Sequence, residues 1–215
     1  PKAADVGGIP GSQVTDFKDD VREGGNPELG GTAVVPVDDP LDILSVIYSA
    51  EPTSATDNSP VLVATMKVSD LTTIPVSSNW RMTLAANAPD SLLSPTGEFT
   101  FGVSDRADQF FVRATTDASG GQTFKYGTAK RNFDGSIAYT DVGNVDCGFF
   151  DQATKTITMK VALNKLNAAL PVGHAPIAPG SVLVGLRGST FTSVGGASGS
   201  NKADTARGGT QYVVT

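Results

Sequence analysis

Residues Leu41–Leu71, LDILSVIYSAEPTSATDNSPVLVATMKVSDL, carry the clearest β-strand signal of the chain. Two apolar segments, 43–48 and 61–68, are joined by a polar segment that contains proline. The second segment alternates as a strand with one face on a core does. The alternation sets Leu62, Ala64, Met66 and Val68 on one face and Val61, Val63, Thr65 and Lys67 on the other. The first segment is apolar at nearly every position, which is typical of a central strand covered on both sides. We therefore predict an all-β fold, an immunoglobulin-like or jelly-roll β-sandwich of about ten strands.

The rest of the chain adds further strands and one short helix. Alternating or apolar stretches predict strands at 79–87, 99–104, 109–116, 122–128, 136–141, 145–150, 155–163, 182–194 and 211–214. A short helix is expected before Pro171, from the helical spacing of Leu163, Leu166 and Leu170. Gly185 and Gly188 are expected at bulges, and residues 195–209, rich in Gly and Ser, are expected to form a loop.

The chain divides into an arm and a body. Residues 1–37 contain many glycines and few large apolar side chains, so we expect a Gly-rich amino-terminal arm packed on the body as loop and edge strand. Residues 38–215 are expected to form a single β-sandwich domain, because no linker separates two cores. The predicted core contains Ile43, Val46, Leu62, Met66, Trp80, Leu84, Phe101, Ile157, Met159 and Val161.

Composition argues against several classes of protein. The net charge of −6, with no cluster of Lys and Arg, argues against a nucleic-acid surface, and no apolar run reaches the roughly 18 residues of a membrane span. The one cysteine, Cys147, permits no intrachain disulfide and is expected in the core. The charged fraction of 18% is typical of secreted bacterial β-proteins, and a start at Pro1 without Met indicates a mature or excised piece. We predict an extracellular or cell-surface location.

The residues available disfavour catalysis. His174 is the only histidine, it lies in a loop rich in Pro and Gly with no evident acidic partner, and the chain has no Gly-x-Ser-x-Gly motif. One His and one Cys are too few for a zinc site. Acidic residues fall where turns and strand ends are expected, among them Asp105, Asp108, Asp117, Asp134 and Asp141. We predict that the protein is not an enzyme.

Two kinds of binding site are compatible with the sequence. Acidic clusters at 16–23 and 38–42 can supply the oxygens that calcium takes, or can be solvated charges at a sheet edge. Exposed aromatic rings would instead mark a glycan platform. The candidates, most of them expected in the core, are Trp80, Phe111, Phe124, Tyr126, Phe133 and Tyr139. Alternation predicts that either Phe110 or Phe111 faces outward, not both.

Several segments together resemble a known kind of domain. They are VTDFKDD at 14–20, DILSVIYSA at 42–50, VLVATMKVSDLTTIPVSSNWRMTL at 61–84, FFVRATTDASGGQTFKYGT at 110–128, CGFFDQATKTITMKVALNKLNAALPVGH at 147–174 and ADTARGGTQYVV at 203–214. The pattern is similar to β-sandwich accessory domains of large secreted bacterial proteins, often found beside subtilisin-like protease or PKD modules. It is more distantly similar to DOMON and family 9 carbohydrate-binding modules.

The resemblance implies a non-catalytic domain, and several such relatives bind structural calcium or a glycan. It also implies a metal site, because Asp16, Asp20 and Asp42 stand where members carry acidic residues. We therefore predict a non-catalytic extracellular accessory or adhesive module of a larger secreted protein, with neighbouring domains as partners and calcium as cofactor. The alternatives are a carbohydrate-binding module that takes a polysaccharide and a self-associating surface-layer or filament subunit.

Overall fold

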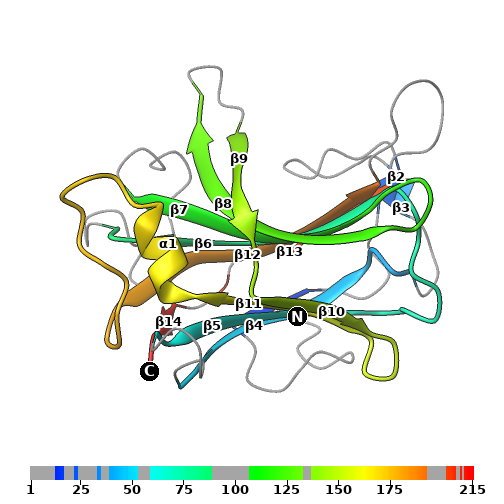
Figure 1. The fold of residues 1–215 in the computed structure, drawn as a ribbon. Coiled ribbons are helices and arrows are strands. Elements are labelled where there is room, and N and C mark those ends of the chain that lie inside the picture. Colours follow the sequence, from blue (N-terminus) through cyan, green and yellow to red (C-terminus); the bar gives the residue numbers. More distant parts are fainter. Residues whose placement is uncertain are drawn as a thin grey trace.

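Two antiparallel β-sheets lie face to face, which confirms the predicted all-β sandwich (Figure 1). The structure is a computed structural model that describes residues 13–16, 22–23, 33–34, 39–52, 59–88, 107–132, 137–192, 202–206, 209 and 211–215. The small sheet has five strands in the order β1-β4-β5-β11-β10. The large sheet has nine, in the order β3-β2-β13-β12-β6-β7-β8-β9, with β14 paired to β12 off this path.

The element bounds match most of the predicted strands. The small sheet contains β1 (Val14–Thr15), β4 (Ile43–Glu51), β5 (Val61–Val68), β10 (Cys147–Asp151) and β11 (Thr156–Ala162). The large sheet contains β2 (Arg22–Glu23), β3 (Ala33–Val34), β6 (Ser78–Ala86), β7 (Asp108–Thr116), β8 (Gln122–Arg131), β9 (Ile137–Asn144), β12 (Val182–Thr192), β13 (Lys202–Ala206) and β14 (Tyr212–Val213). The predicted helix is α1 (Leu163–Ala168), and the predicted strand at 99–104 lies outside the described residues.

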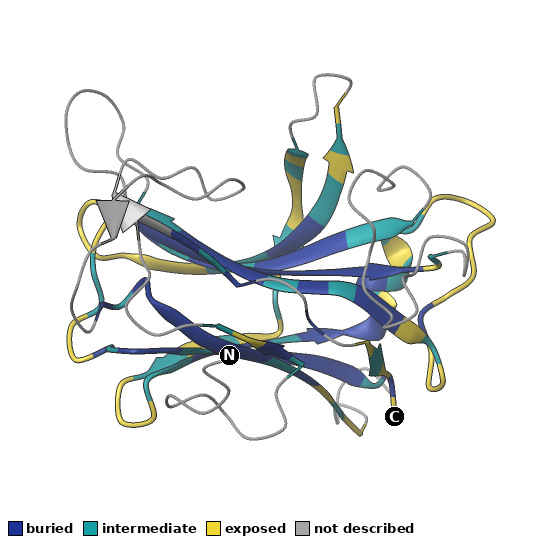
Figure 2. Ribbon diagram, turned by 180° about the vertical axis from the view of Figure 1, so that it is seen from behind, coloured by how far each residue is buried: buried dark blue, intermediate teal, exposed yellow. Residues whose placement is uncertain are grey.

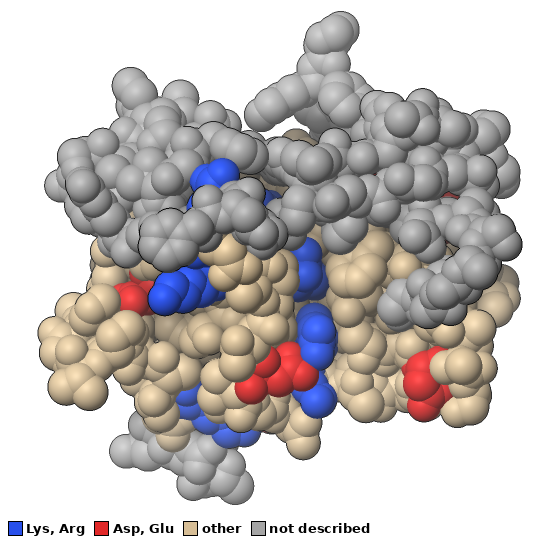
Figure 3. All heavy atoms as spheres, turned by 90° about the horizontal axis from the view of Figure 1, so that it is seen from above, with Lys and Arg blue, Asp and Glu red and all other residues tan. Residues whose placement is uncertain are grey.

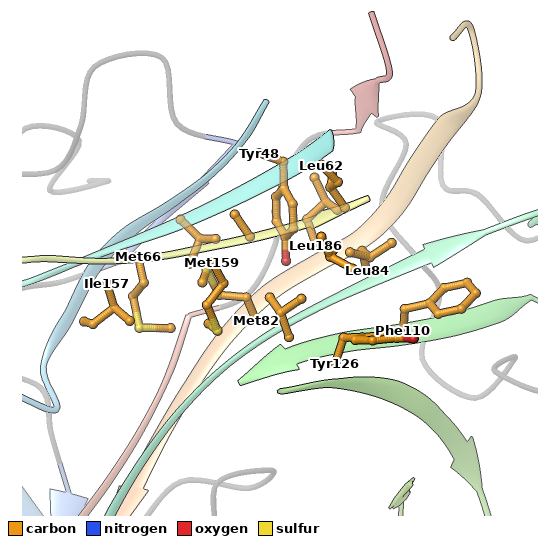
Figure 4. Close-up of a cluster of buried hydrophobic side chains, with 14 of the residues drawn as sticks. Tyr48, Leu62, Met66, Met82, Leu84, Phe110, Tyr126, Ile157, Met159 and Leu186 are labelled. Carbon is orange, nitrogen blue, oxygen red and sulfur yellow. The ribbon is translucent and has the colours of Figure 1, made fainter. Parts of the chain in front are cut away.

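The core lies between the two sheets, where buried residues of both face each other (Figure 2). Every predicted core residue that the structure describes is at most 1% exposed: Ile43, Val46, Leu62, Met66, Trp80, Leu84, Ile157, Met159 and Val161. In the close-up of Figure 4, Met66 and Met159 of the small sheet point toward Met82 and Leu186 of the large sheet. The period-two pattern therefore assigned the inner faces correctly, because in a sheet successive side chains point to opposite sides.

Tyr48 ties the two sheets together with a polar contact across this core. Its hydroxyl donates a hydrogen bond of 2.8 Å to the backbone carbonyl of Thr83, which lies on the large sheet. Burial raises the pKa of the Tyr48 phenol far above its ordinary value, so the hydroxyl keeps its proton and donates at any ordinary pH.

Two glycines of β12 have different roles. Gly185 has a φ of 61° and lies where the register to β6 shifts, as expected for a bulge. Gly188 was predicted at a second bulge, but it pairs in register with Met82. A Cβ at Gly188 would lie 2.9 Å from Cγ2 of Val46, so the glycine allows the two sheets to approach.

Two other predictions are wrong. Part of the predicted loop 195–209 is strand β13, which pairs with β12 and places a buried Asp204 beside β4. The residues of β13 are mostly polar and show no apolar alternation, so the sequence did not indicate a strand here. Cys147 is exposed rather than in the core, because it lies on β10, the edge strand of the small sheet, and faces outward.

The β8–β9 hairpin rises above the outer face of the large sheet (Figure 1). The register between the two strands shifts between Tyr126 and Gly127. A Cβ at Gly127 would lie 2.1 Å from the carbonyl oxygen of Thr140 and 2.6 Å from Cζ of Phe111. Glycine at this position therefore lets the hairpin pack directly on the aromatic ring below it.

Candidate binding surface

The predicted calcium ligands are only partly described by the structure. Asp42 is fully buried at the entry to β4, and the backbone N–H of Asp16 donates to the carbonyl of Leu44 at 3.0 Å. Strand β1 thus brings Asp16 alongside the start of β4, whereas Asp20 lies outside the described residues. Within the described part of the chain, no group of three or more His, Cys, Asp or Glu residues could hold a metal ion.

The calcium site therefore stays a prediction that depends on Asp20. If it exists, the melting temperature should rise with calcium and fall with a chelator, by mass action on the folded state. Asp42→Asn should reduce this response, and an unchanged melting curve in chelator would contradict the site.

Two neighbouring carboxylates stabilise the backbone where the chain enters β4. Oδ1 of Asp39 accepts a hydrogen bond of 2.8 Å from the backbone N–H of Leu41. Oδ2 of Asp204, on β13, accepts one of 2.7 Å from the backbone N–H of Ile43. Both carboxylates are buried, so these bonds compensate for lost solvation. Their role is structural.

His174 has an acidic partner, contrary to the prediction. Its Nδ1 lies 2.9 Å from both carboxylate oxygens of Asp108, at the start of β7. Asn87 donates to Asp108 at 2.8 Å and to the carbonyl of Ala175 at 2.9 Å, which fastens the loop around His174 to the end of β6. This pair could not be predicted from the sequence because its two residues are 66 positions apart.

Most of the predicted aromatic candidates are not on the surface. Trp80, Phe111 and Tyr126 are buried, and Phe124 packs against the core. Phe110 and Phe111 are both buried, which contradicts the prediction that one of them is outside. The ring of Tyr139, on β9, covers Phe111 edge to face at a centroid distance of 5.4 Å. Phe133 lies outside the described residues.

A row of three cationic side chains crosses the outer face of the large sheet. Arg81 of β6 lies directly opposite Arg113 of β7, which lies directly opposite Lys125 of β8. Their sequence neighbours belong to or pack against the core, so these three side chains are on the other side of the sheet. Like charges directly opposite each other destabilise a sheet. We call Arg81, Arg113 and Lys125 the cation row.

One carboxylate serves two members of the cation row. Nη2 of Arg113 lies 2.6 Å from Oδ2 of Asp141, and Nζ of Lys125 lies 3.2 Å from the same oxygen. About a third of each side chain is exposed, at 28% for Arg113, 39% for Lys125 and 29% for Asp141. The Nε of Arg113 is buried and makes no hydrogen bond. Asp141, which the sequence places at the end of a strand, lies within β9 and faces the cation row.

Aromatic rings stand beside the same row. The guanidinium carbon of Arg81 lies 3.5 Å from the centroid of the Tyr139 ring and 5.4 Å from that of Phe191, on β12. Arg81 is buried under these contacts, whereas Tyr139 and Phe191 are each partly exposed. A cation against an aromatic face is electrostatically favourable, so the rings hold Arg81 in place and keep part of their own area at the surface.

Seen from above, Lys and Arg side chains gather in a row across the middle of this face, beside a few acidic ones (Figure 3). Arg187 of β12 adds a further cation, held by a 3.0 Å hydrogen bond from its Nε to Oγ1 of Thr83. The described part of this face thus combines positive charge, hydrogen-bond donors and planar rings. This combination can bind an anionic or polar ligand.

Because Trp80 is a predicted core residue, alternation along 79–87 sets Arg81 on the outward face, but the sequence pattern did not select the row. A usable signal existed in the hairpin of β7 and β8, where the turn at 117–121 pairs Thr116 with Gln122. Counting back along both strands from that turn sets Arg113 opposite Lys125. The contribution of β6 could not be counted in this way, because its pairing with β7 is not set by a tight turn.

Comparison of the chain with protein-family models, with curated protein sequences and with solved structures found no match. In the described residues, no helix is long and apolar enough to cross a membrane.

Proposed function

We propose that this chain is a non-catalytic accessory module of a secreted protein that binds a polysaccharide on the outer face of its large sheet. The observation that carries the proposal is the cation row, in which Arg81, Arg113 and Lys125 lie in register on adjacent strands. Such a row works against stability, so a use in binding explains it better than folding does. Extracellular location rests on the composition of the chain.

Partly exposed rings beside the row support a saccharide ligand. Tyr139 and Phe191 flank Arg81, and planar rings of this kind pack against the apolar faces of sugars while donors bind the hydroxyl groups. The strands that carry these residues belong to one continuous sheet, which gives the surface a rigid support.

Affinity gel electrophoresis tests the proposal with a panel of neutral and acidic polysaccharides. The wild-type chain should be retarded by at least one of them. Tyr139→Ala and Phe191→Ala should reduce the retardation, because each removes a ring from the surface. The matched control is Phe149→Ala, since Phe149 is 42% exposed on the outer face of the small sheet. Equal loss with the control, or no retardation by any polysaccharide, would contradict the proposal.

The absence of catalysis stays a prediction with its own assay. Esterase, protease and glycosidase substrates should not be turned over, and His174→Ala should leave every reading at the background rate. Turnover that depends on His174 or on Asp108 would identify their 2.9 Å contact as catalytic and overturn the non-catalytic part of the proposal. Self-association also stays a prediction, and size-exclusion chromatography before and after deletion of residues 1–29 tests it.

A further inference from the structure

We infer that the polysaccharide is acidic, and that Arg113 and Lys125 bind the carboxylate groups of its sugars. This inference rests on the proposed function and specifies its ligand. This surface presents two partly exposed cations on neighbouring strands, and a cation binds a carboxylate more strongly than it binds a neutral hydroxyl group. Neighbouring strands are about 4.8 Å apart, so the two charges can engage one carboxylate together or adjacent groups along one glycan.

The present contact with Asp141 leaves binding capacity unused. Arg113 and Lys125 both meet Oδ2 of Asp141, and Arg113 does so through Nη2. A guanidinium binds a carboxylate best through two parallel hydrogen bonds. A ligand carboxylate can provide this two-oxygen contact, whereas Asp141 meets Arg113 through one oxygen. Asp141 therefore occupies the position that the ligand carboxylate takes, and it is displaced on binding.

A sugar acid fits this surface better than other polyanions. Arg113 and Lys125 could neutralise only a few phosphates of a long, densely charged nucleic acid. An acidic peptide would supply carboxylates but would make no use of two planar rings at the same place. The rings of Tyr139 and Phe191 lie against Arg81, which is directly opposite Arg113 on the neighbouring strand, so one glycan chain can contact both kinds of group.

Polygalacturonate and its fully methyl-esterified form make a matched pair of ligands, because they share a backbone and differ in charge. Isothermal titration calorimetry should show binding to the acid form only, with weaker binding at higher salt. Arg113→Gln and Lys125→Gln should each weaken binding by about tenfold, the loss of roughly one charge-assisted contact. Lys160→Gln is the matched control, since Lys160 is equally exposed on the other sheet and pairs with Glu51 at 2.6 Å.

Asp141→Asn provides a second variant with the opposite sign. It removes the internal competitor and one negative charge, so binding of polygalacturonate should become several-fold tighter. Tighter binding in this variant cannot be explained by damage to the fold. Weaker binding of polygalacturonate by Asp141→Asn would contradict the displacement of Asp141.

The outcomes separate this inference from the function on which it rests. Equal binding of both ligand forms, or binding only to neutral polysaccharides of the panel, would overturn the acidic ligand and leave a polysaccharide-binding module. No binding to any polysaccharide would overturn both. Binding to double-stranded DNA or to anionic phospholipid vesicles, without binding to polygalacturonate, would also overturn both, because the cations would then serve another class of partner.

Discussion

The outer faces of the two sheets obey the same alternation and yet carry different chemistry. On the small sheet the cross-strand neighbours complement each other, as where the hydroxyls of Thr65 and Thr158 meet at 3.2 Å. Lys160 on that face lies opposite Val63 and pairs with Glu51 at 2.6 Å. On the large sheet three cations lie opposite one another and share the surface with aromatic rings.

Selection for a stable fold explains the outer face of the small sheet, but it does not explain the outer face of the large sheet. The small sheet has the outer face of an ordinary solvated surface, in which Lys160 lies opposite an uncharged residue and pairs with Glu51. The large sheet keeps a destabilising arrangement and surrounds it with the β8–β9 hairpin, which places Asp141 and Tyr139 over the row. A site that works against stability is the better candidate for function.

The largest effect should come from the core that the two faces share. Met159→Asp places a carboxylate among apolar side chains at a position that is 0% exposed. Burial of an unpaired charge costs several kcal/mol, comparable with a total stability of about 5–15 kcal/mol. Circular dichroism should show an unfolded chain, and both faces should lose their structure together. A cooperative melting transition in this variant would contradict the assigned core.

The next largest effect should come from a change on the large sheet that lowers both stability and ligand binding. Gly127→Val places a side chain against Phe111 and the carbonyl of Thr140, and overpacking of this kind costs about 1–3 kcal/mol. It should also displace the hairpin and thereby weaken polysaccharide binding. Urea denaturation measures the first effect and affinity electrophoresis the second. Ala138→Val on exposed β9 is the control, and an equal loss of stability there would contradict close packing at Gly127.

A smaller effect should differ in size between the two faces. Lys125→Thr relieves a like-charge contact with Arg113 but also removes the ion pair with Asp141, so the two effects oppose each other and the free energy of unfolding should change little. Lys160→Thr removes an ion pair with Glu51 without such relief, so the free energy of unfolding should fall by up to about 1 kcal/mol. Urea denaturation at low salt measures both. An equal fall in both variants would remove the energetic contrast between the faces.

The smallest effect concerns the turn that sets Arg113 opposite Lys125. Hydrogen bonds from the Ser119 hydroxyl, then from the backbone N–H groups of Gly121 and Ser119, lower the pKa of Asp117. A lowered folded-state pKa stabilises the fold above the unfolded pKa of about 3.9, and this contribution disappears as pH falls through the folded pKa. Asp117→Asn should therefore lower the melting temperature at pH 7. The difference from wild type should vanish in strong acid, and a constant difference at all pH values would contradict the linkage.

The sequence was sufficient for the inner faces because their signal is local. In Val61–Val68, alternation alone identified the side chains that enter the core, and the same reasoning placed Trp80 and Met159. Alternation failed to predict the burial of Phe111. The side chain does face outward, as alternation requires, but Tyr139 of the β8–β9 hairpin covers it. When a segment distant in the sequence buries a side chain, the alternation of apolar and polar residues along the strand does not show it.

The candidate binding surface was harder to predict because it depends on register between strands. Arg113 and Lys125 could have been paired by counting from their common turn, whereas Arg81 comes from a strand that precedes β7 by more than a tight turn. The contact of Tyr139 with Arg81 further requires the register shift at Gly127. For the same reason the contact of His174 with Asp108 could not be predicted from the sequence.

Backbone amide shifts measured by NMR during titration with oligogalacturonate test most directly whether the outer face of the large sheet is the binding surface. If the ligand binds there, the largest changes will occur at Arg113, Lys125 and Tyr139, with none above background at Thr158 and Lys160 of the small sheet. Saturable changes centred on the outer face of the small sheet, or no saturable change at any amide, would contradict binding at the large sheet.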